Sequence, residues 1–129
     1  MYILTVEEHF SSAHQLRGYR GKCENLHGHN WKVILNVKGT QLNEIGLLID
    51  FGDLKSMLKN ILALLDHTNI NDIPYFSKNN PSSENIARYI ADMMTQELSN
   101  GNYTTVSLDS ITVWESDTSR CTFIHSSQT

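Results

Sequence analysis

Apolar and polar residues alternate along four stretches of the chain, residues 2–10, 27–37, 104–115 and 120–125. A period of two places every second side chain on the same face, which is typical of strands that bury one face. The pattern is cleanest in the second stretch, whose odd positions read His27, His29, Trp31, Val33, Leu35 and Val37. These four stretches predict four strands.

Between the second and third predicted strands the period changes to that of a helix. Residues 50–65 carry apolar side chains three and four positions apart, with Asp50 as the expected N-cap. A polar loop over residues 69–80 leads to Asn80 and Pro81, which we interpret as the N-cap and first residue of a second helix. Its buried face is predicted from Ile86, Tyr89, Ile90, Met93 and Met94, and its end from Gly101.

The order of these elements, ββααββ, predicts an α+β fold in which two helices cover one face of a four-stranded antiparallel sheet. The length of 129 residues favours a single domain over residues 1–129. An open sheet of four strands has edges that a protein must cover or pair. We therefore expect copies of the chain to form a homo-oligomer.

Composition and charge narrow the classes of partner. With 40% hydrophobic residues, 19% charged residues and a net charge of −4, the chain has an ordinary globular composition without a basic face for nucleic acid. No apolar run approaches the roughly 20 residues of a membrane helix, and the N-terminus does not resemble an export signal. We therefore expect no nucleic-acid partner, no membrane partner and a cytoplasmic location. Cys23 and Cys121 are then expected to be free thiols.

A metal site is indicated by histidine content and spacing. Of six histidines, four precede residue 30. Because His27 and His29 share one face of a predicted strand, both can reach one ion, and a neighbouring strand can bring His14 to it. Three imidazoles with an open fourth position are typical of catalytic zinc, whereas structural zinc usually needs closely spaced cysteines, which are absent here. The alternative is that these are packing or surface histidines.

Several other residues are candidates for acid–base or binding roles. Cys23 lies four residues before His27 and becomes a base or nucleophile if a neighbour stabilises its thiolate, or else is an inert loop cysteine. Asp66 and His67 form either a proton relay or a polar helix cap. Glu115 follows apolar Ile111 and Val113 on one strand face, so it is either an inward ligand-binding carboxylate or an exposed strand end. The basic residues Arg17, Arg20 and Lys22 either hold phosphate or belong to a solvated loop.

The segment from Cys23 to His29, with Leu65-Asp66-His67 and Val113-Trp114-Glu115, resembles the 6-pyruvoyl-tetrahydropterin synthase / 6-carboxy-tetrahydropterin synthase family. Phe10-Ser11-Ser12-Ala13-His14, Ile49-Asp50-Phe51 and the segment from Pro81 to Ala87 also match it. The family's usual Pro-Thr-x-Glu-Asn is here Pro81-Ser82-Ser83-Glu84-Asn85, which keeps a hydroxyl, so we expect contacts to the pterin from Ser82 and Ser83.

The resemblance implies the tunnelling fold, in which ββααββ subunits form trimeric barrels that stack into hexamers with active sites at subunit interfaces. It implies one zinc ion per subunit on His14, His27 and His29, with Cys23 as proton acceptor and Asp66 and His67 as a relay. Glu115 is implied to anchor the pterin ring. Lys22 is a candidate contact to the substrate's triphosphate.

The implied substrate is 7,8-dihydroneopterin triphosphate, which undergoes internal redox, so no nicotinamide or flavin is expected. Three residues separate Cys23 from His27, as in carboxy-forming enzymes, which release acetaldehyde and triphosphate on the route to queuosine-type 7-deazaguanines. Three alternatives stay open: the pyruvoyl-forming enzyme, a non-catalytic zinc- or pterin-binding module, and an unrelated zinc hydrolase. The last is disfavoured because no carboxylate lies next to the histidine pair on its strand.

Overall fold

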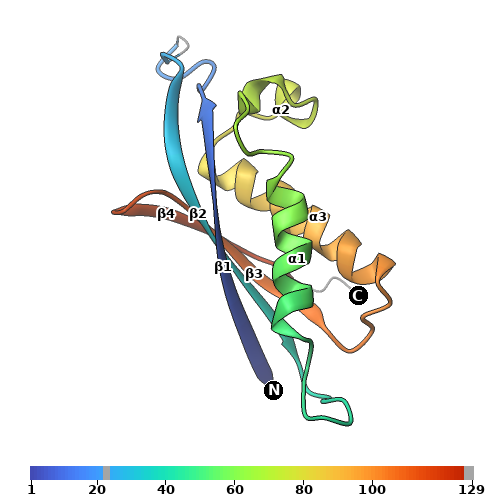
Figure 1. Cartoon of the computed structure of the whole chain (residues 1–129). Coiled ribbons are helices and arrows are strands. Elements are labelled where there is room, and N and C mark those ends of the chain that lie inside the picture. The colour runs from blue at the N-terminus through green and yellow to red at the C-terminus, as the bar shows by residue number, and fades with distance from the viewer. Residues whose placement is uncertain (22–23, 127–129) are drawn as a thin grey trace.

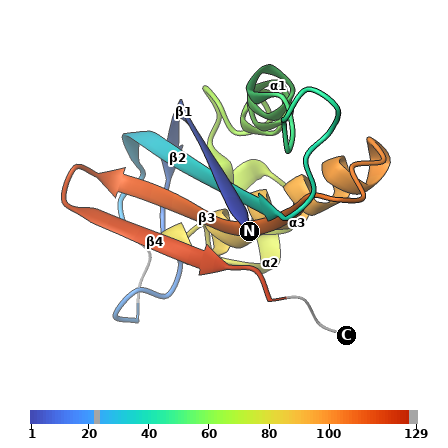
Figure 2. The same cartoon turned by 90° about the horizontal axis from the view of Figure 1, so that it is seen from below.

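The computed structural model describes residues 1–21 and 24–126. One antiparallel sheet contains all four strands in the order β1-β2-β3-β4, and α1, α2 and α3 lie on one side of it (Figures 1 and 2). The elements along the chain are β1 (Tyr2–His14), β2 (His27–Gly39), α1 (Phe51–Leu62), a 3-10 turn η1 (Ile70–Asp72), α2 (Tyr75–Lys78), α3 (Ser83–Asn100), β3 (Ser107–Ser116) and β4 (Ser119–Ile124). The predicted α+β class and sheet are therefore confirmed.

The loop predicted over residues 69–80 is wrong in part, because it contains η1 and the short helix α2. Neither is long enough to show a hydrophobic period. Asn69 caps η1 by accepting a hydrogen bond from the backbone N–H of Asn71 at 3.1 Å. Phe76, fully buried, fixes α2 against the core.

Strands β1 and β2 form the longest ladder, running from the pair Tyr2–Gly39 to the pair His14–His27. The odd residues of β2 from Trp31 to Val37 point under the helices and are all fully buried. His27 and His29 continue this row at the start of the strand. The core therefore leads directly to the predicted metal-binding histidines.

Helix α1 begins as predicted, because the Asp50 carboxylate accepts hydrogen bonds from the backbone N–H groups of Gly52 at 2.7 Å and Asp53 at 3.3 Å. It ends three residues earlier than predicted, at Leu62, although Leu65 is still buried in the turn that follows. The apolar period therefore extends beyond the helix that it predicts.

Helix α3 begins at Ser83 with Ser82 as its N-cap, so the predicted start at Asn80 and Pro81 is wrong. The Asn80 side chain cannot cap the helix, because it exchanges two hydrogen bonds with the backbone of Arg17. The Ser82 hydroxyl instead accepts a hydrogen bond from the backbone N–H of Asn85 at 3.2 Å. Gly101 ends the helix as predicted.

The face of the sheet away from the helices is polar. Asn36 links Thr5 and Ser110 by side-chain hydrogen bonds, and Lys32 and Arg120 both lie over the ring of Trp114. This face contrasts with the apolar one under the helices. None of the helices in the described residues is long and apolar enough to cross a membrane.

Candidate metal centre

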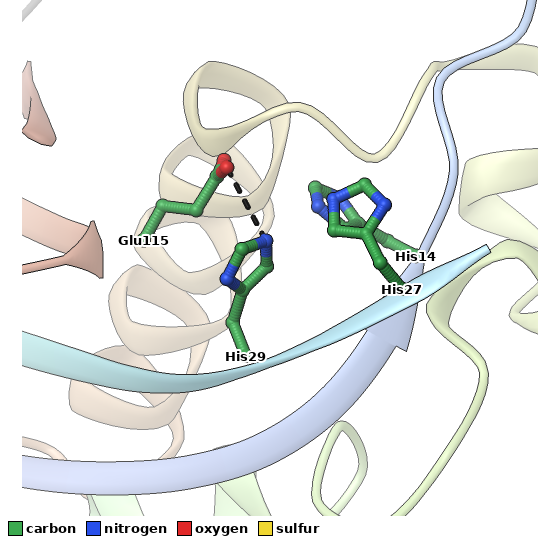
Figure 3. Close-up of side chains that lie close together, drawn as sticks. All are labelled: His14, His27, His29 and Glu115. Atoms are coloured by element: carbon green, nitrogen blue, oxygen red, sulfur yellow. Dashed lines mark ion pairs between the residues drawn. The ribbon is translucent and has the colours of Figure 1, made fainter. Parts of the chain in front are cut away.

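Three histidine rings meet where β1 ends and β2 begins (Figure 3). The antiparallel register pairs His14 with His27, and His29 follows two positions along β2 on the same face. The ring centroids are 4.6 Å apart for His14 and His27, 4.8 Å for His27 and His29, and 5.3 Å for His14 and His29. The structure therefore brings together the three residues predicted as metal ligands.

Backbone carbonyls orient two of these rings. The Nδ1 atom of His14 lies 2.6 Å from the carbonyl oxygen of Pro81, and that of His27 lies 2.8 Å from the carbonyl oxygen of Asn25. Because a carbonyl only accepts hydrogen bonds, each Nδ1 carries the proton and each Nε2 presents a lone pair. This arrangement is typical of metal-binding histidines, whose second nitrogen donates to a carbonyl or carboxylate.

The Nε2 atoms of His14 and His29 are shielded from solvent and have no hydrogen-bond partner among residues 1–21 and 24–126. Leaving a buried polar atom unpaired costs about 1–3 kcal/mol, and a bound ion or ligand at these atoms would offset that cost. Burial is the main cause that lowers the pKa of His29, with smaller lowering effects of His14 and His27, while Glu115 and Glu24 oppose the shift. A low pKa favours the neutral imidazole that a metal requires.

Glu115 reaches the same point from β3. Its Oε1 atom lies 3.3 Å from Nε2 of His29, and its Oε2 atom accepts a 3.1 Å hydrogen bond from the hydroxyl of Ser83 (Figure 3 shows the first contact). The pairing of β3 with β4 shifts register between Trp114 and Ser116, and such irregularities redirect side chains near functional sites. Glu115 is therefore not the exposed strand end of the alternative interpretation.

His14, His27, His29 and Glu115 together form a group whose possible ligand atoms all lie within 4.8 Å of one another. Imidazole nitrogens and a carboxylate oxygen are ligands that zinc accepts. Two of the nitrogens are shielded and have no partner in the part of the chain that the structure describes, so the residues present fit a zinc ion. No carboxylate lies next to the histidine pair on β2, as the sequence argument against a zinc hydrolase stated, but Glu115 supplies one beside His29 from β3.

Asp66 and His67 lie at the edge of β1. The Nδ1 atom of His67 is 2.9 Å from Asp66 Oδ2, while the backbone N–H of Ser11 donates to Asp66 Oδ1 at 2.9 Å. The Ser11 hydrogen bond is the main cause that lowers the pKa of Asp66, and the bond from His67 adds to it. Their interpretation as a helix cap is wrong, because α1 ends at Leu62 and the His67 N–H donates to the carbonyl of Ser11.

His67 is exposed and has an unusual backbone. Its side chain is 82% exposed, and its φ of 54° lies in the left-handed region that non-glycine residues rarely adopt. The backbone of the next residues holds it in place, since Thr68 accepts hydrogen bonds from both the N–H of Ala13 and the hydroxyl of Ser12. The imidazole therefore projects into solvent from a fixed position.

The remaining predicted residues divide into three groups. Ser82 caps α3, and the Ser83 hydroxyl donates to Glu115, which lies beside His29. The Arg17 guanidinium donates to the carbonyl of Phe76 at 2.6 Å, which gives it a structural partner. Lys22 and Cys23 lie outside the described residues.

Sequence reasoning missed Glu24. Its Oε1 atom lies 4.0 Å from Nε2 of His27 and accepts a 3.1 Å hydrogen bond from the backbone N–H of Leu16. Its position could have been predicted, because a carboxylate three residues before a predicted metal ligand lies close to that ligand in space.

The chain matches one family of known proteins along nearly all of its length. The family model described as 6-pyruvoyl tetrahydropterin synthase matches residues 3–126. The chain belongs to this family. The matched residues include all four strands, apart from Tyr2, and both long helices, so the match extends over the whole fold.

Two relatives show how the family divides. A 6-carboxy-5,6,7,8-tetrahydropterin synthase from Haemophilus influenzae is 30% identical, and the match covers 95% of this chain and 99% of the relative. A 6-pyruvoyl tetrahydrobiopterin synthase from Poecilia reticulata is 36% identical over 75% of each chain. The two product classes are thus both represented at similar identity.

Solved structures agree on the fold. The 6-pyruvoyl tetrahydropterin synthase of Caenorhabditis elegans superposes with a TM-score of 0.79 at 28% identity, covering 98% of both chains. A Plasmodium vivax 6-pyruvoyltetrahydropterin synthase in which a catalytic glutamate is replaced by cysteine has a TM-score of 0.78 at 25% identity, covering 95% of this chain and 96% of that one. The tunnelling fold predicted from the sequence is confirmed.

Proposed function

We propose that the chain is a zinc-dependent 6-carboxy-5,6,7,8-tetrahydropterin synthase. It would convert 7,8-dihydroneopterin triphosphate and water to 6-carboxy-tetrahydropterin, acetaldehyde and triphosphate, on the route to queuosine-type 7-deazaguanines. The observation that carries the proposal is the convergence of His14, His27 and His29 in a chain of this family. Two of their Nε2 atoms are shielded and have no partner among the described residues.

The choice of product rests on sequence spacing. Three residues separate Cys23 from His27, which favours the carboxy-forming branch. The relative from Haemophilus influenzae carries that name and matches this chain over nearly its whole length. Overall sequence identity does not distinguish the two products, because a pyruvoyl-forming relative is equally similar to this chain.

His14, His27 and His29 would hold the zinc ion, with the carbonyls of Pro81 and Asn25 fixing two of the rings. Bound there, zinc supplies Lewis-acid polarisation of the substrate's side-chain hydroxyls, which makes neighbouring protons easier to remove. Trp31 packs against the rings of His14 and His29 at 4.9 and 5.3 Å, which excludes water from the core side of the site.

Glu115 and the start of α3 would hold the pterin ring. A carboxylate can accept two parallel hydrogen bonds from the ring's 2-amino group and adjacent ring N–H, a charge-assisted pair that fixes orientation. Ser83 already donates to Glu115 at 3.1 Å and so orients the carboxylate. Ser82 is committed to capping α3, so its contribution to pterin binding would come through the position of the helix start.

Proton transfer would use Cys23, Asp66 and His67. Because Asp66 accepts a hydrogen bond from Nδ1–H of His67, the Nε2 atom of His67 is free to accept a proton. Its 82% exposure fits a relay that works against a surface of another subunit. We therefore propose a homohexamer of two trimers in which His67 faces the site of a neighbouring copy, with Lys22 near the substrate's triphosphate.

Glu24 is a second candidate for the proton acceptor. It lies 4.0 Å from Nε2 of His27, and a relative from Plasmodium vivax has a catalytic glutamate. Glutamate carboxylates are among the side chains that serve as general bases. Comparing the turnover of Cys23→Ala with that of Glu24→Gln would decide which residue takes the proton.

The test is turnover of 7,8-dihydroneopterin triphosphate with zinc analysis and product identification by mass spectrometry. We expect acetaldehyde and a carboxylated tetrahydropterin. A product that keeps its three-carbon side chain would assign the pyruvoyl-forming reaction instead. Zinc and pterin binding without turnover would assign a non-catalytic module. If Cys23→Ala turns over substrate as fast as the parent, the proton-acceptor role of Cys23 is wrong.

A further inference from the structure

The contact between Glu115 and His29 has an unusual geometry for a simple pair. The 3.3 Å separation of Oε1 and Nε2 is within ion-pair reach, yet Nε2 has no hydrogen-bond partner among the described residues. Two ligands of one zinc ion, bound at about 2.0–2.1 Å with tetrahedral angles, lie about 3.3–3.4 Å apart. The two atoms thus have the spacing of neighbouring ligands.

The second oxygen of Glu115 is anchored independently. Ser83 donates to Oε2 at 3.1 Å, so the first turn of α3 holds the carboxylate with Oε1 directed to the histidines. The side chain of Glu115 is 35% exposed, compared with 24% for His29. A partly exposed carboxylate on a strand irregularity can leave this position without opening the core.

We propose that Glu115 is the fourth metal ligand of the substrate-free protein and leaves the metal to bind the pterin ring. The inference rests on the zinc site of the proposed function and adds a second state to it. His14, His27 and His29 stay bound in both states, while Glu115 changes partner. The metal–carboxylate contact is broken, and the hydrogen bonds to the pterin replace it.

Such an exchange couples recognition of the ring to access to the metal. Only a ligand that offers adjacent N–H groups to the carboxylate draws Glu115 away and frees a coordination position for its own hydroxyls. A simple polyol has the hydroxyls but lacks the two adjacent N–H groups that pair with a carboxylate, so it displaces a charged ligand with less compensation. The site would therefore select pterins before chemistry begins, because a ligand shifts such an equilibrium only by its differential affinity.

The first experiment measures zinc affinity by competition with a chromophoric chelator. We expect Glu115→Gln to weaken zinc binding by at least about tenfold, since even indirect contacts to a metal site are worth 10–100-fold. Ser83→Ala, which frees the carboxylate, should weaken it less. Glu24→Gln is the charge-matched control, because it removes another carboxylate near His27, and its effect should stay within about threefold. Equal effects of Glu115→Gln and Glu24→Gln, or no effect of either, would overturn the proposal.

The second experiment uses Co²⁺ in place of zinc and reads its visible absorption, which reports coordination number directly. We expect the parent spectrum to change on addition of 7,8-dihydroneopterin but not of glycerol at the same concentration. Glu115→Gln should start with a different spectrum. An unchanged spectrum in Glu115→Gln would show that Glu115 is not a ligand. Because neither readout needs turnover, a failure of the proposed reaction would leave these results intact, and thermal unfolding of the metal-free variants checks that each is folded.

Discussion

The histidine cluster and the Asp66–His67 pair are built in opposite ways. His14 is 1% exposed and its Nδ1 atom is oriented by the carbonyl of Pro81, whereas the His67 side chain is 82% exposed on a left-handed backbone. The carbonyls that orient His14 and His27 belong to the same chain as the rings. In the pair, hydrogen bonds hold the backbone around His67 while its side chain stays exposed. The residues predicted to bind metal and the residues predicted to transfer protons thus differ in burial.

The strongest way to break this contrast is to remove a cluster ligand. His29→Ala should lower zinc affinity by more than about a hundredfold and abolish turnover, since three imidazoles hold the open form of the site. Metal content after dialysis and turnover of 7,8-dihydroneopterin triphosphate measure both effects. Turnover that survives the loss of zinc would contradict the metal mechanism.

Changing His67 should affect only the reaction. His67→Ala is expected to lower turnover by about 10²–10⁴-fold, the usual contribution of a general acid or base, with zinc content unchanged. His67→Gly should have the same turnover as His67→Ala. Its free energy of unfolding should equal that of the parent or exceed it by up to about 1 kcal/mol, because glycine accepts the left-handed φ. A large loss of stability in His67→Gly would show that the imidazole is structural.

A mixing experiment sharpens the contrast further. If His67 serves the site of a neighbouring copy, then Cys23→Ala and His67→Ala, each nearly inactive alone, should regain part of the parent turnover after joint unfolding and refolding. Mixed oligomers would contain some interfaces with both intact residues. The matched control is each variant refolded alone. No recovery in a mixture that forms mixed oligomers would place both residues in one chain's site.

The smallest expected effect concerns pH. The pKa of Asp66 lies below its usual value of about 3.9, so its contribution to stability is present above that pH and is lost as the pH falls through the folded-state pKa. Asp66→Asn keeps an oxygen that can accept from the Ser11 N–H but has no charge to titrate. As the pH is lowered from roughly 5 to 2, the midpoint temperature of thermal unfolding should therefore fall more steeply in the parent than in Asp66→Asn. The same pH dependence in the parent and in Asp66→Asn would contradict a lowered pKa of Asp66.

Local patterns predicted the strands and the common face of His27 and His29, because a period of two is a property of the strand itself. The place of His14 was harder to predict. It depends on the register that pairs His14 with His27 across 13 residues of ladder, and several registers fit the same alternation. The family resemblance, rather than periodicity, implied that His14 joins His27 and His29.

Other features depend on competition for the same groups. Asn80 has the right sequence context for an N-cap, but its amide is engaged by Arg17, so Ser82 caps α3 instead. Glu115 was assigned to the pterin from the resemblance, whereas its approach to His29 depends on an irregularity in the β3–β4 pairing. Both outcomes depend on contacts between segments far apart in sequence.

Trp31 gives the molecule its own optical reporter. The indole is fully buried, donates to the carbonyl of Ser12 at 3.2 Å, and stacks on Phe10 while touching the rings of His14 and His29. The only other tryptophan, Trp114, lies on the opposite face between two cations and emits from a different environment. A paramagnetic ion entering the histidine cluster should quench the blue-shifted emission of Trp31, so that loading can be followed in real time without a label.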